Sequence, residues 1–286
     1  MNPPLLRHVT ALALGAWLTL LPYTATAEEV ETVELSPGWS YRVVAEDLPR
    51  VDNVVRGPGG YLYVTLELGK PNGKLVRIDD PGALVVVDGL DHPDGLFASG
   101  GLLYITEETS EGRVLAVDVE AATMTTVATL NHPEGIAMLP NGEMIIAEDR
   151  SLGGRVVRLA EDGTVHPFMD QLVRPEGLTV GPDGAVFVAE TAKGRIVGFR
   201  DGRMWEVAGG LAQPDQVVWG PDGTLWVTED QNPGRLLRIA RDGLVVVARG
   251  LHSPQGIHFA GGEVLVAEQG RGRLLALRWK APKTND

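Results

Sequence analysis

His132-Pro133-Glu134-Gly135-Ile136-Ala137 opens a pattern that recurs along the whole chain. After it come a Pro-Asn-Gly turn, an apolar run that ends at Glu148, and the pair Gly154-Arg155. Two further copies read Arg174-Pro175-Glu176-Gly177-Leu178 with Glu190 and Gly194-Arg195, and Gln213-Pro214-Asp215-Gln216-Val217 with Glu229 and Gly234-Arg235. The position of Pro133 recurs at Val51, Pro93, Pro175, Pro214 and Pro254, in steps of 42, 40, 42, 39 and 40 residues. A period of about 40 residues with several short strands is typical of a β-propeller.

Each repeat predicts four antiparallel strands. In the third repeat the first strand covers 135–139 and the turn Pro140-Asn141-Gly142 closes it, while Asp162-Gly163 marks the turn before the fourth strand. The fold class is therefore all-β, a six-bladed β-propeller. The sixth repeat ends after its third strand, at 273–279, and an unassigned strand at 39–46 precedes the first repeat. We expect this N-terminal strand to complete the last blade and close the ring, which removes exposed strand edges.

The N-terminal 27 residues resemble a secretory signal peptide. Arg7 and His8 precede an apolar run at 11–21, and Ala25-Thr26-Ala27 offers small residues before a cleavage point. A membrane anchor is the alternative, but a span needs roughly 20 apolar residues. We expect an acidic leader at 28–37, the propeller at 38–280 and a polar tail at 281–286. The expected location is the periplasm or the outside of the cell.

The composition restricts the partners. The chain has no cysteine, so an exported form does without disulfides and holds no thiolate-bound metal. Its formal net charge of −13 argues against binding to DNA, RNA or anionic lipid. We expect a monomer that takes a small-molecule substrate or ligand and has no membrane span once the signal peptide is removed.

The second strand of every repeat ends close to a glutamate. These residues are Glu67, Glu107, Glu148, Glu190, Glu229 and Glu268. A basic residue follows five to seven positions later, at Lys74, Arg113, Arg155, Arg195, Arg235 and Arg273. Because arginine can bind a carboxylate through two hydrogen bonds, a repeated pair across one hairpin favours a structural role. A functional ring of charge is the alternative.

The first strand of every repeat begins with a second set of polar residues. These are Asp52, Asp94, Glu134, Glu176, Asp215 and, as the exception, Gln255. No basic residue recurs beside them, and carboxylates gathered around one channel repel each other. A bound cation, shared protons or hydration must offset the repulsion. Oxygen ligands select Ca²⁺ or another divalent cation such as Mg²⁺. The alternative is that these acids only begin the strand and stay hydrated.

His92, His132 and His252 lie two or three residues before this ring. They are candidates for lining the channel mouth as ligands or general bases. The alternative is that they are turn residues beside proline.

The repeat resembles the NHL repeat, on the strength of 133–137, Asn141-Gly142 and Ile146-Ala147-Glu148. The chain is also similar to the regucalcin/gluconolactonase superfamily (SMP-30-like), which includes strictosidine-synthase-like proteins. That resemblance covers nearly all of the chain after the signal peptide. It implies a six-bladed propeller with one divalent cation, typically Ca²⁺, at the channel mouth.

The resemblance also implies residue roles. By position, Asp52, Glu176 and Asp215 would be the metal ligands, Asp215 the general base, and Glu134 a residue that holds the substrate or the metal-bound water. The chain departs from the family pattern at the third- and fourth-blade positions, where glutamate replaces the common asparagine. The enzyme hypothesis is therefore a metal-dependent hydrolase of a small lactone or ester. The competing hypothesis is a non-catalytic binding or scaffold propeller.

Overall fold

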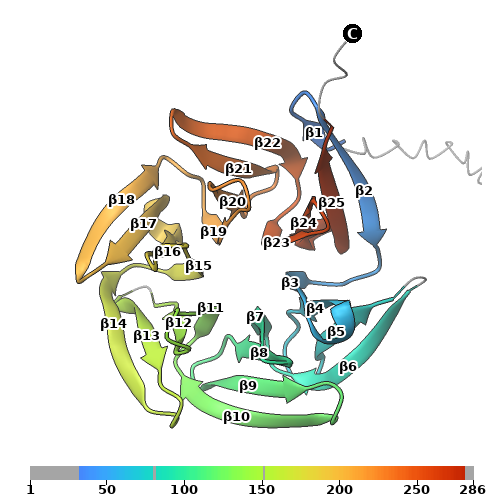
Figure 1. Cartoon of the computed structure of the whole chain (residues 1–286). Helices are drawn as coiled ribbons and strands as arrows, with labels where there is room; N and C mark the ends of the chain where they lie inside the picture. The colour runs from blue at the N-terminus through green and yellow to red at the C-terminus, as the bar shows by residue number, and fades with distance from the viewer. Residues whose placement is uncertain (1–31, 80–81, 151, 281–286) are drawn as a thin grey trace, which may run out of the picture. The chain divides into compact units, whose positions relative to one another are not determined.

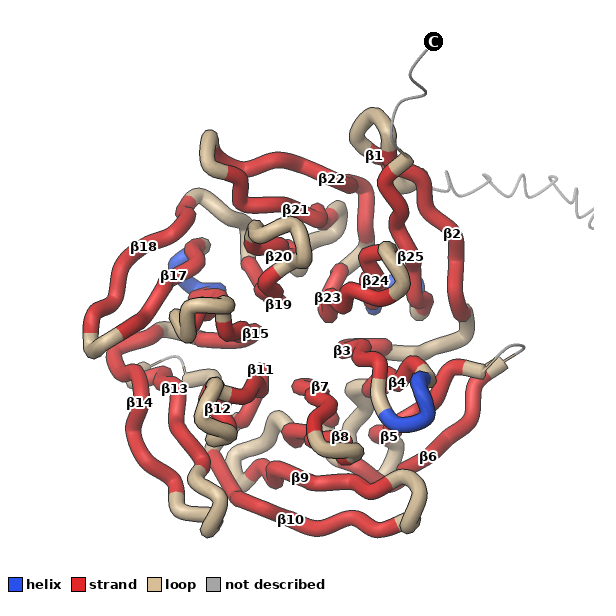
Figure 2. The backbone as a smooth tube through the Cα atoms, in the orientation of Figure 1, coloured by secondary structure: helices blue, strands red, loops and turns tan. Residues whose placement is uncertain are grey.

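The computed structural model of this chain describes residues 32–79, 82–150 and 152–280. They form the predicted six-bladed β-propeller, in which six antiparallel sheets surround a central channel (Figure 1). The innermost strand of each sheet lies next to the channel, and the turns lie at the ends of the strands (Figure 2). The expected signal peptide and polar tail lie outside the described residues.

The first three blades follow each other along the chain. Blade 1 contains β3 (Val51–Arg56), β4 (Leu62–Leu66), β5 (Gly73–Ile78) and β6 (Ala83–Leu90). Blade 2 contains β7 (Pro93–Ser99), β8 (Leu102–Glu107), β9 (Gly112–Asp118) and β10 (Thr123–Leu130). Blade 3 contains β11 (Pro133–Met138), β12 (Met144–Glu148), β13 (Gly154–Leu159) and β14 (Val165–Leu172).

The other three blades repeat the same order. Blade 4 contains β15 (Pro175–Val180), β16 (Val186–Glu190), β17 (Arg195–Arg200) and β18 (Arg203–Gly209). Blade 5 contains β19 (Pro214–Trp219), β20 (Leu225–Glu229), β21 (Gly234–Ala240) and β22 (Gly243–Leu251). Blade 6 contains β23 (Pro254–Ala260), β24 (Glu263–Glu268), β25 (Arg273–Trp279) and the N-terminal β2 (Trp39–Ala45).

The closure of the ring is as predicted. Strand β2 pairs antiparallel with β25, with Tyr41 opposite Leu277, so the two ends of the chain complete one blade. A two-residue strand, β1 (Glu34–Leu35), pairs with β22 of blade 5. Part of the segment expected as a leader is therefore already hydrogen-bonded to the propeller.

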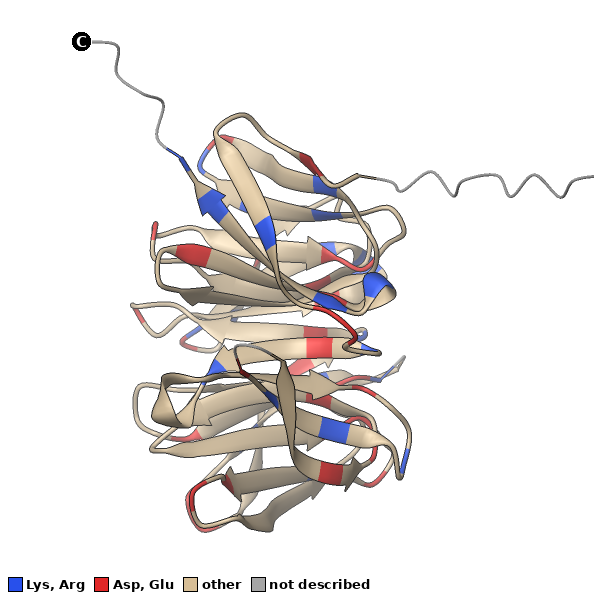
Figure 3. Ribbon diagram, turned by 90° about the vertical axis from the view of Figure 1, so that its right-hand side faces the viewer, with Lys and Arg blue, Asp and Glu red and all other residues tan. Residues whose placement is uncertain are grey.

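The hydrophobic core lies between neighbouring blades. One cluster joins Tyr63 and Leu75 of blade 1 to Leu103 and Leu115 of blade 2, all of them almost fully buried. Seen from the edge of the propeller, acidic and basic segments are interspersed along the blades (Figure 3). The described residues include three single-turn 3₁₀ helices, η1 (Pro58–Gly60), η2 (Thr191–Lys193) and η3 (Gln269–Arg271), and no helix long and apolar enough to cross a membrane.

Candidate functional site

The acid that begins each blade sits in a β-bulge. In blade 3, Pro133 lies opposite Glu148 and Ile136 lies opposite Ile146, so one strand carries an extra residue between these two pairs. The same shift occurs at the start of the other five blades. A bulge of this kind redirects a side chain. It explains how the residue at this position, an acid in five blades and Gln255 in the sixth, faces the central channel.

The glycine that follows the acid is explained by close packing between neighbouring blades. A Cβ on Gly135 would lie 2.7 Å from the backbone oxygen of Glu176 in the next blade, and a Cβ on Gly95 would overlap the corresponding oxygen of Glu134. The inner strands of neighbouring blades therefore approach each other closely just below the ring of acids. This close approach narrows the channel beneath the site.

The predicted ion pairs of the second strand form in five blades. Arg113 binds Glu107 with two nitrogens at 2.5 and 2.6 Å, and the equivalent pairs are Arg155–Glu148, Arg195–Glu190, Arg235–Glu229 and Arg273–Glu268. Each glutamate also accepts a backbone N–H from the loop that enters its own blade, as Asp91 donates to Glu107 at 2.9 Å. We call these five residues the staple glutamates, and their role is structural.

The predicted ion pair between Glu67 and Lys74 does not form in blade 1, so the prediction was wrong there. The residue opposite Val51 is Leu66, so Leu66 occupies the staple position and Glu67 lies one residue beyond it. Lys74 binds the exposed Asp88 instead, at 2.7 Å. Glu67 belongs to a different set of residues, which the sequence analysis did not recognise.

This second set follows the staple position in every blade. In each member the backbone N–H donates to the carbonyl of the residue before the Pro133-type position, as Glu108 donates to His92 at 2.9 Å. The six residues are Glu67, Glu108, Asp149, Thr191, Asp230 and Gln269. The doublets Glu107-Glu108, Glu148-Asp149 and Glu229-Asp230 were the available signal in the sequence. Because neighbouring residues in extended chain project to opposite sides, the first acid of each doublet pairs with arginine while the second projects away from that pair. Glu108 and Asp230 line the channel, whereas Asp149 binds Arg174 at 3.1 Å.

The two inner sets form a cavity of about 160 Å³ at the channel mouth. Among the described residues, eight carboxyl groups and two arginines line it: Asp52, Glu67, Asp94, Glu108, Glu134, Glu176, Asp215 and Asp230, with Arg50 and Arg174. Gln255 and Gln269 complete the wall. The acids that the sequence predicted at the start of each blade thus share one cavity.

The three metal ligands that the resemblance implied each have a hydrogen-bond partner. Gln269 donates to Asp52 at 3.1 Å, and Arg174 donates to Glu176 at 3.1 Å. With its amide nitrogen turned toward Asp215, Gln255 donates to both carboxylate oxygens at 2.6 and 2.9 Å. All of these residues line the cavity, and the partners hold their side chains in place.

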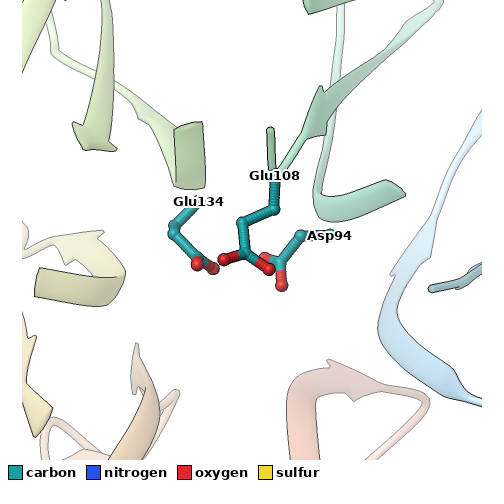
Figure 4. Close-up of side chains that lie close together, drawn as sticks. All are labelled: Asp94, Glu108 and Glu134. Carbon is teal, nitrogen blue, oxygen red and sulfur yellow. The ribbon is translucent and has the colours of Figure 1, made fainter. Parts of the chain in front are cut away.

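A tighter group of carboxylates lies on the other side of the cavity. Oxygen atoms of Asp94, Glu108 and Glu134 all lie within 4.8 Å of one another, and Figure 4 shows the three side chains pointing toward a common centre. Within the described residues, no ion pair joins them to lysine or arginine. We call these residues the acidic triad. Two ligand oxygens of one Ca²⁺ lie at most about 5 Å apart, so the spacing and the all-oxygen donor set fit a Ca²⁺-type cation.

Burial and mutual repulsion raise the pKa values of most of the cavity acids, among them Glu134, Asp215 and Glu176. Burial is the largest cause for Glu134, followed by the charges of Asp94 and Glu108. The pKa of Asp215 is raised well above its usual range by burial and by the charges of Glu176 and Asp52. Burial also raises the pKa of Glu176 to about 7, although the charge of Arg174 opposes the increase. The cavity therefore disfavours its own full ionisation.

The three candidate histidines do not occupy equivalent positions. His92 and His132 have left-handed backbone conformations, with φ of 46° and 47°, at the same repeat position as Arg50 and Arg174. His252 lies one position earlier, where its N–H donates to the staple glutamate Glu268. None of the three is among the residues that line the cavity. His92 instead contacts Asp91 through Nδ1 at 3.0 Å.

Solved structures with the same fold include two described as gluconolactonases. The chain matches one described as a putative gluconolactonase with a TM-score of 0.70 and 16% identity over 87% of this chain and 96% of that chain. It matches a gluconolactonase from Xanthomonas campestris with a TM-score of 0.73 and 16% identity, over 86% of this chain and 91% of that chain. The predicted resemblance to the gluconolactonase fold is thereby confirmed at the level of structure.

A structure with a different activity has the same fold. The virginiamycin B lyase of Staphylococcus aureus matches with a TM-score of 0.60 and 15% identity, over 86% of this chain and 99% of that chain. No protein-family model and no curated protein matches the sequence. At these identities the likeness shows the fold, and fold alone does not assign an activity.

Proposed function

We propose that this propeller binds a divalent cation, Ca²⁺ in the first instance, through the acidic triad of Asp94, Glu108 and Glu134. The observation that carries the proposal is the gathering of three carboxylates within 4.8 Å without a basic partner among the described residues. Glu134 is only 6% exposed, so water screens its charge poorly. A cation offsets this repulsion and lets the three acids stay ionised.

We propose further that the bound cation supports hydrolysis of a small lactone or ester. When bound, a divalent cation supplies Lewis-acid polarisation of a carbonyl oxygen and activation of water. Asp215 is the general base that accepts a proton from the attacking water and returns it to the alkoxide that leaves. Burial and the charges of Glu176 and Asp52 raise its pKa, which makes its carboxylate a stronger base, and Gln255 orients that carboxylate. An ester gives a carboxylic acid and an alcohol, and a lactone gives one hydroxy acid.

One observation favours the competing function. A volume of about 160 Å³ lies below the range of about 300–1,000 Å³ that is typical of small-molecule sites. Only the reacting end of an ester would enter such a space. A non-catalytic propeller that uses the cation for stability or for recognition is therefore the second candidate. Export to the periplasm or to the outside of the cell, and a monomeric state, belong to both proposals.

The first experiment tests the cation. The purified protein is melted in EDTA and then with added Ca²⁺, Mg²⁺ or Mn²⁺, and the affinity is measured by calorimetric titration. Binding to the folded state predicts a Tm that rises with the concentration of the cation. An unchanged Tm together with no heat of binding for any of the three cations contradicts the proposal.

Matched variants then locate the cation. Glu108→Gln removes one member of the acidic triad, and we expect Ca²⁺ affinity to fall by about 10-fold or more. Asp230→Asn is the control, because Asp230 occupies the same repeat position in blade 5 and lines the same cavity. If Asp230→Asn or Asp215→Asn abolishes binding and Glu108→Gln does not, the cation lies on the side of the cavity that the resemblance implied.

A third experiment separates the enzyme from the binding protein. Lactones and aryl esters are screened with the Ca²⁺-loaded wild type and with Asp215→Asn. Turnover that is lost in Asp215→Asn, with Ca²⁺ affinity retained, supports catalysis. Cation binding without turnover of any substrate favours the non-catalytic alternative.

A further inference from the structure

Three buried threonines connect neighbouring blades just below the cavity. Thr65, Thr106 and Thr228 occupy the same position in the second strands of blades 1, 2 and 5, one residue before the staple position, and all are fully buried. In the other three blades this position holds Ala147, Ala189 and Ala267. The hydroxyl link described below is therefore a property of particular blades rather than of the repeat.

Each threonine hydroxyl donates to the backbone oxygen of the residue that begins the next blade. Thr65 donates to Asp94 at 3.0 Å and Thr106 donates to Glu134 at 2.7 Å. Thr228 donates to Gln255 at 2.7 Å. Two of the three links thus end on members of the acidic triad, and the third ends on the one uncharged member of the ring.

Thr106 has the shorter path to the site. It lies on β8, two residues before Glu108, which directly follows the end of that strand, and its hydroxyl donates to the backbone oxygen of Glu134. This hydrogen bond therefore links the segment that carries Glu108 in blade 2 to the backbone of Glu134 in blade 3. The tight packing of Gly95 against both the Thr106 hydroxyl and the Glu134 carbonyl leaves little room for this contact to shift.

We propose that Thr106, supported by Thr65, is a positioning residue that sets the separation of the carboxylates in the acidic triad. Neither side chain has to touch the cation. Groups that orient metal ligands from behind typically change metal affinity by about 10–100-fold when they are removed. The inference rests on the proposed function, because it concerns the geometry of the proposed cation site.

The test compares Thr106→Val with Thr228→Val. Both substitutions keep the shape of the side chain, and both leave a buried carbonyl without its hydroxyl donor. We expect Tm to fall in both variants in EDTA, and at least as far in Thr228→Val, because the Thr228 hydroxyl also accepts the Gln216 N–H at 3.2 Å. We expect Ca²⁺ affinity to fall about 10-fold or more in Thr106→Val and less than about 3-fold in Thr228→Val. Thr106→Ser, which keeps the donor, should restore most of the affinity.

The outcomes are distinguishable. If wild type binds Ca²⁺ and Thr106→Val binds it equally well, or if Thr228→Val weakens it as much as Thr106→Val does, the positioning role is wrong while the cation site stands. If Thr106→Val does not fold, Thr106→Ser and Thr65→Val are measured against Thr228→Val, and equal affinities among these three overturn the inference. A wild-type protein that binds no divalent cation overturns the proposed function and this inference together.

Discussion

The staple glutamate Glu107 and the cavity acid Glu108 are consecutive in the chain, yet their surroundings are opposite. Glu107 is 2% exposed and is bound by Arg113 and by a backbone N–H, whereas Glu108 faces Asp94 and Glu134. Burial alone would raise the pKa of a staple glutamate such as Glu148, but the hydrogen bonds from Arg155 and from the Asn131 N–H outweigh burial and lower it. In the cavity, burial and the charges of neighbouring acids outweigh the hydrogen bonds that form there, and the pKa values of Glu108 and Glu134 rise. The charged and hydrogen-bonding groups around a buried carboxyl thus decide whether its pKa rises or falls.

The largest expected effect is a loss of folding stability as pH rises, which follows from the raised pKa of cavity acids such as Glu176. A carboxyl whose folded pKa is raised contributes stability that is fully present below its unfolded pKa and is lost as pH rises through the folded pKa. For Glu176 the pKa rises from 4.5 to about 7, so about 3 kcal/mol is lost over this range from this group alone. In EDTA we therefore expect urea midpoints to fall between pH 4.5 and pH 8. Added Ca²⁺ should reduce the fall, because it favours the ionised acids.

The staple glutamate Glu148 contributes a pH dependence of the opposite sign. The lowered pKa of Glu148 contributes stability above pH 4.5 that is lost as pH falls further. The two sets together predict maximal stability of the EDTA-treated protein near pH 4–5. Stability that is flat or rising from pH 5 to pH 8 in EDTA would show that the cavity acids are screened by water, which removes the main reason for a cation.

The second prediction concerns the stability that the staple glutamate Glu107 contributes. Glu107→Gln removes the ion pair with Arg113, and we expect a loss of about 2–3 kcal/mol in the free energy of unfolding, since hydrogen bonds to charged groups contribute about 1.5–3 kcal/mol. Urea unfolding at pH 7 measures this loss. The matched control is Arg200→Met, which breaks the exposed pair with Asp183 and should cost less than about 1 kcal/mol.

The third prediction is the counterpart at Glu108. In EDTA, Glu108→Gln should stabilise the protein by at least about 1 kcal/mol, the size expected for removing one like charge at about 4 Å in bulk water, because water screens the cavity less than that. With Ca²⁺ the same variant should be less stable than wild type, because it lacks a ligand. Wild type should therefore be the less stable of the two proteins in EDTA and the more stable of the two with Ca²⁺. If Glu108→Gln destabilises the protein in EDTA as Glu107→Gln does, then the two positions are alike and the comparison fails.

The sequence was sufficient to predict the architecture, and the reasons are local. The period of the Pro-acid-Gly pattern and its turns predicted six blades, and the orphan strand at 39–46 predicted the closure that β2 makes with β25. The acids at the start of the blades were also recognised, because symmetry brings equivalent positions to one channel. The direction of their side chains depends on a β-bulge, which neither the strand propensity of the residues nor the period of the repeat reveals.

The second inner set was missed because side-chain direction at the end of a strand depends on register. Glu67 and Glu107 look alike in the sequence, but the pairing of Val51 with Leu66 moves Glu67 one position beyond the staple. The side chain of Glu67 therefore faces the cavity, where Arg50 and Gln269 bind it. Spacing to the next basic residue, which ranges over five to seven positions, was too variable to detect a shift of one.

The smallest expected effect tests that register directly. Lys74→Met should change the free energy of unfolding by less than about 0.5 kcal/mol, because Lys74 pairs with Asp88, which is 62% exposed, and water screens the pair. Arg113→Met should cost several times more, because it leaves Glu107 buried without its cation. Both are measured by urea unfolding in EDTA. Equal losses in the two variants would mean that Lys74 neutralises a buried acid after all, and that Glu67 belongs with the staples rather than with the cavity.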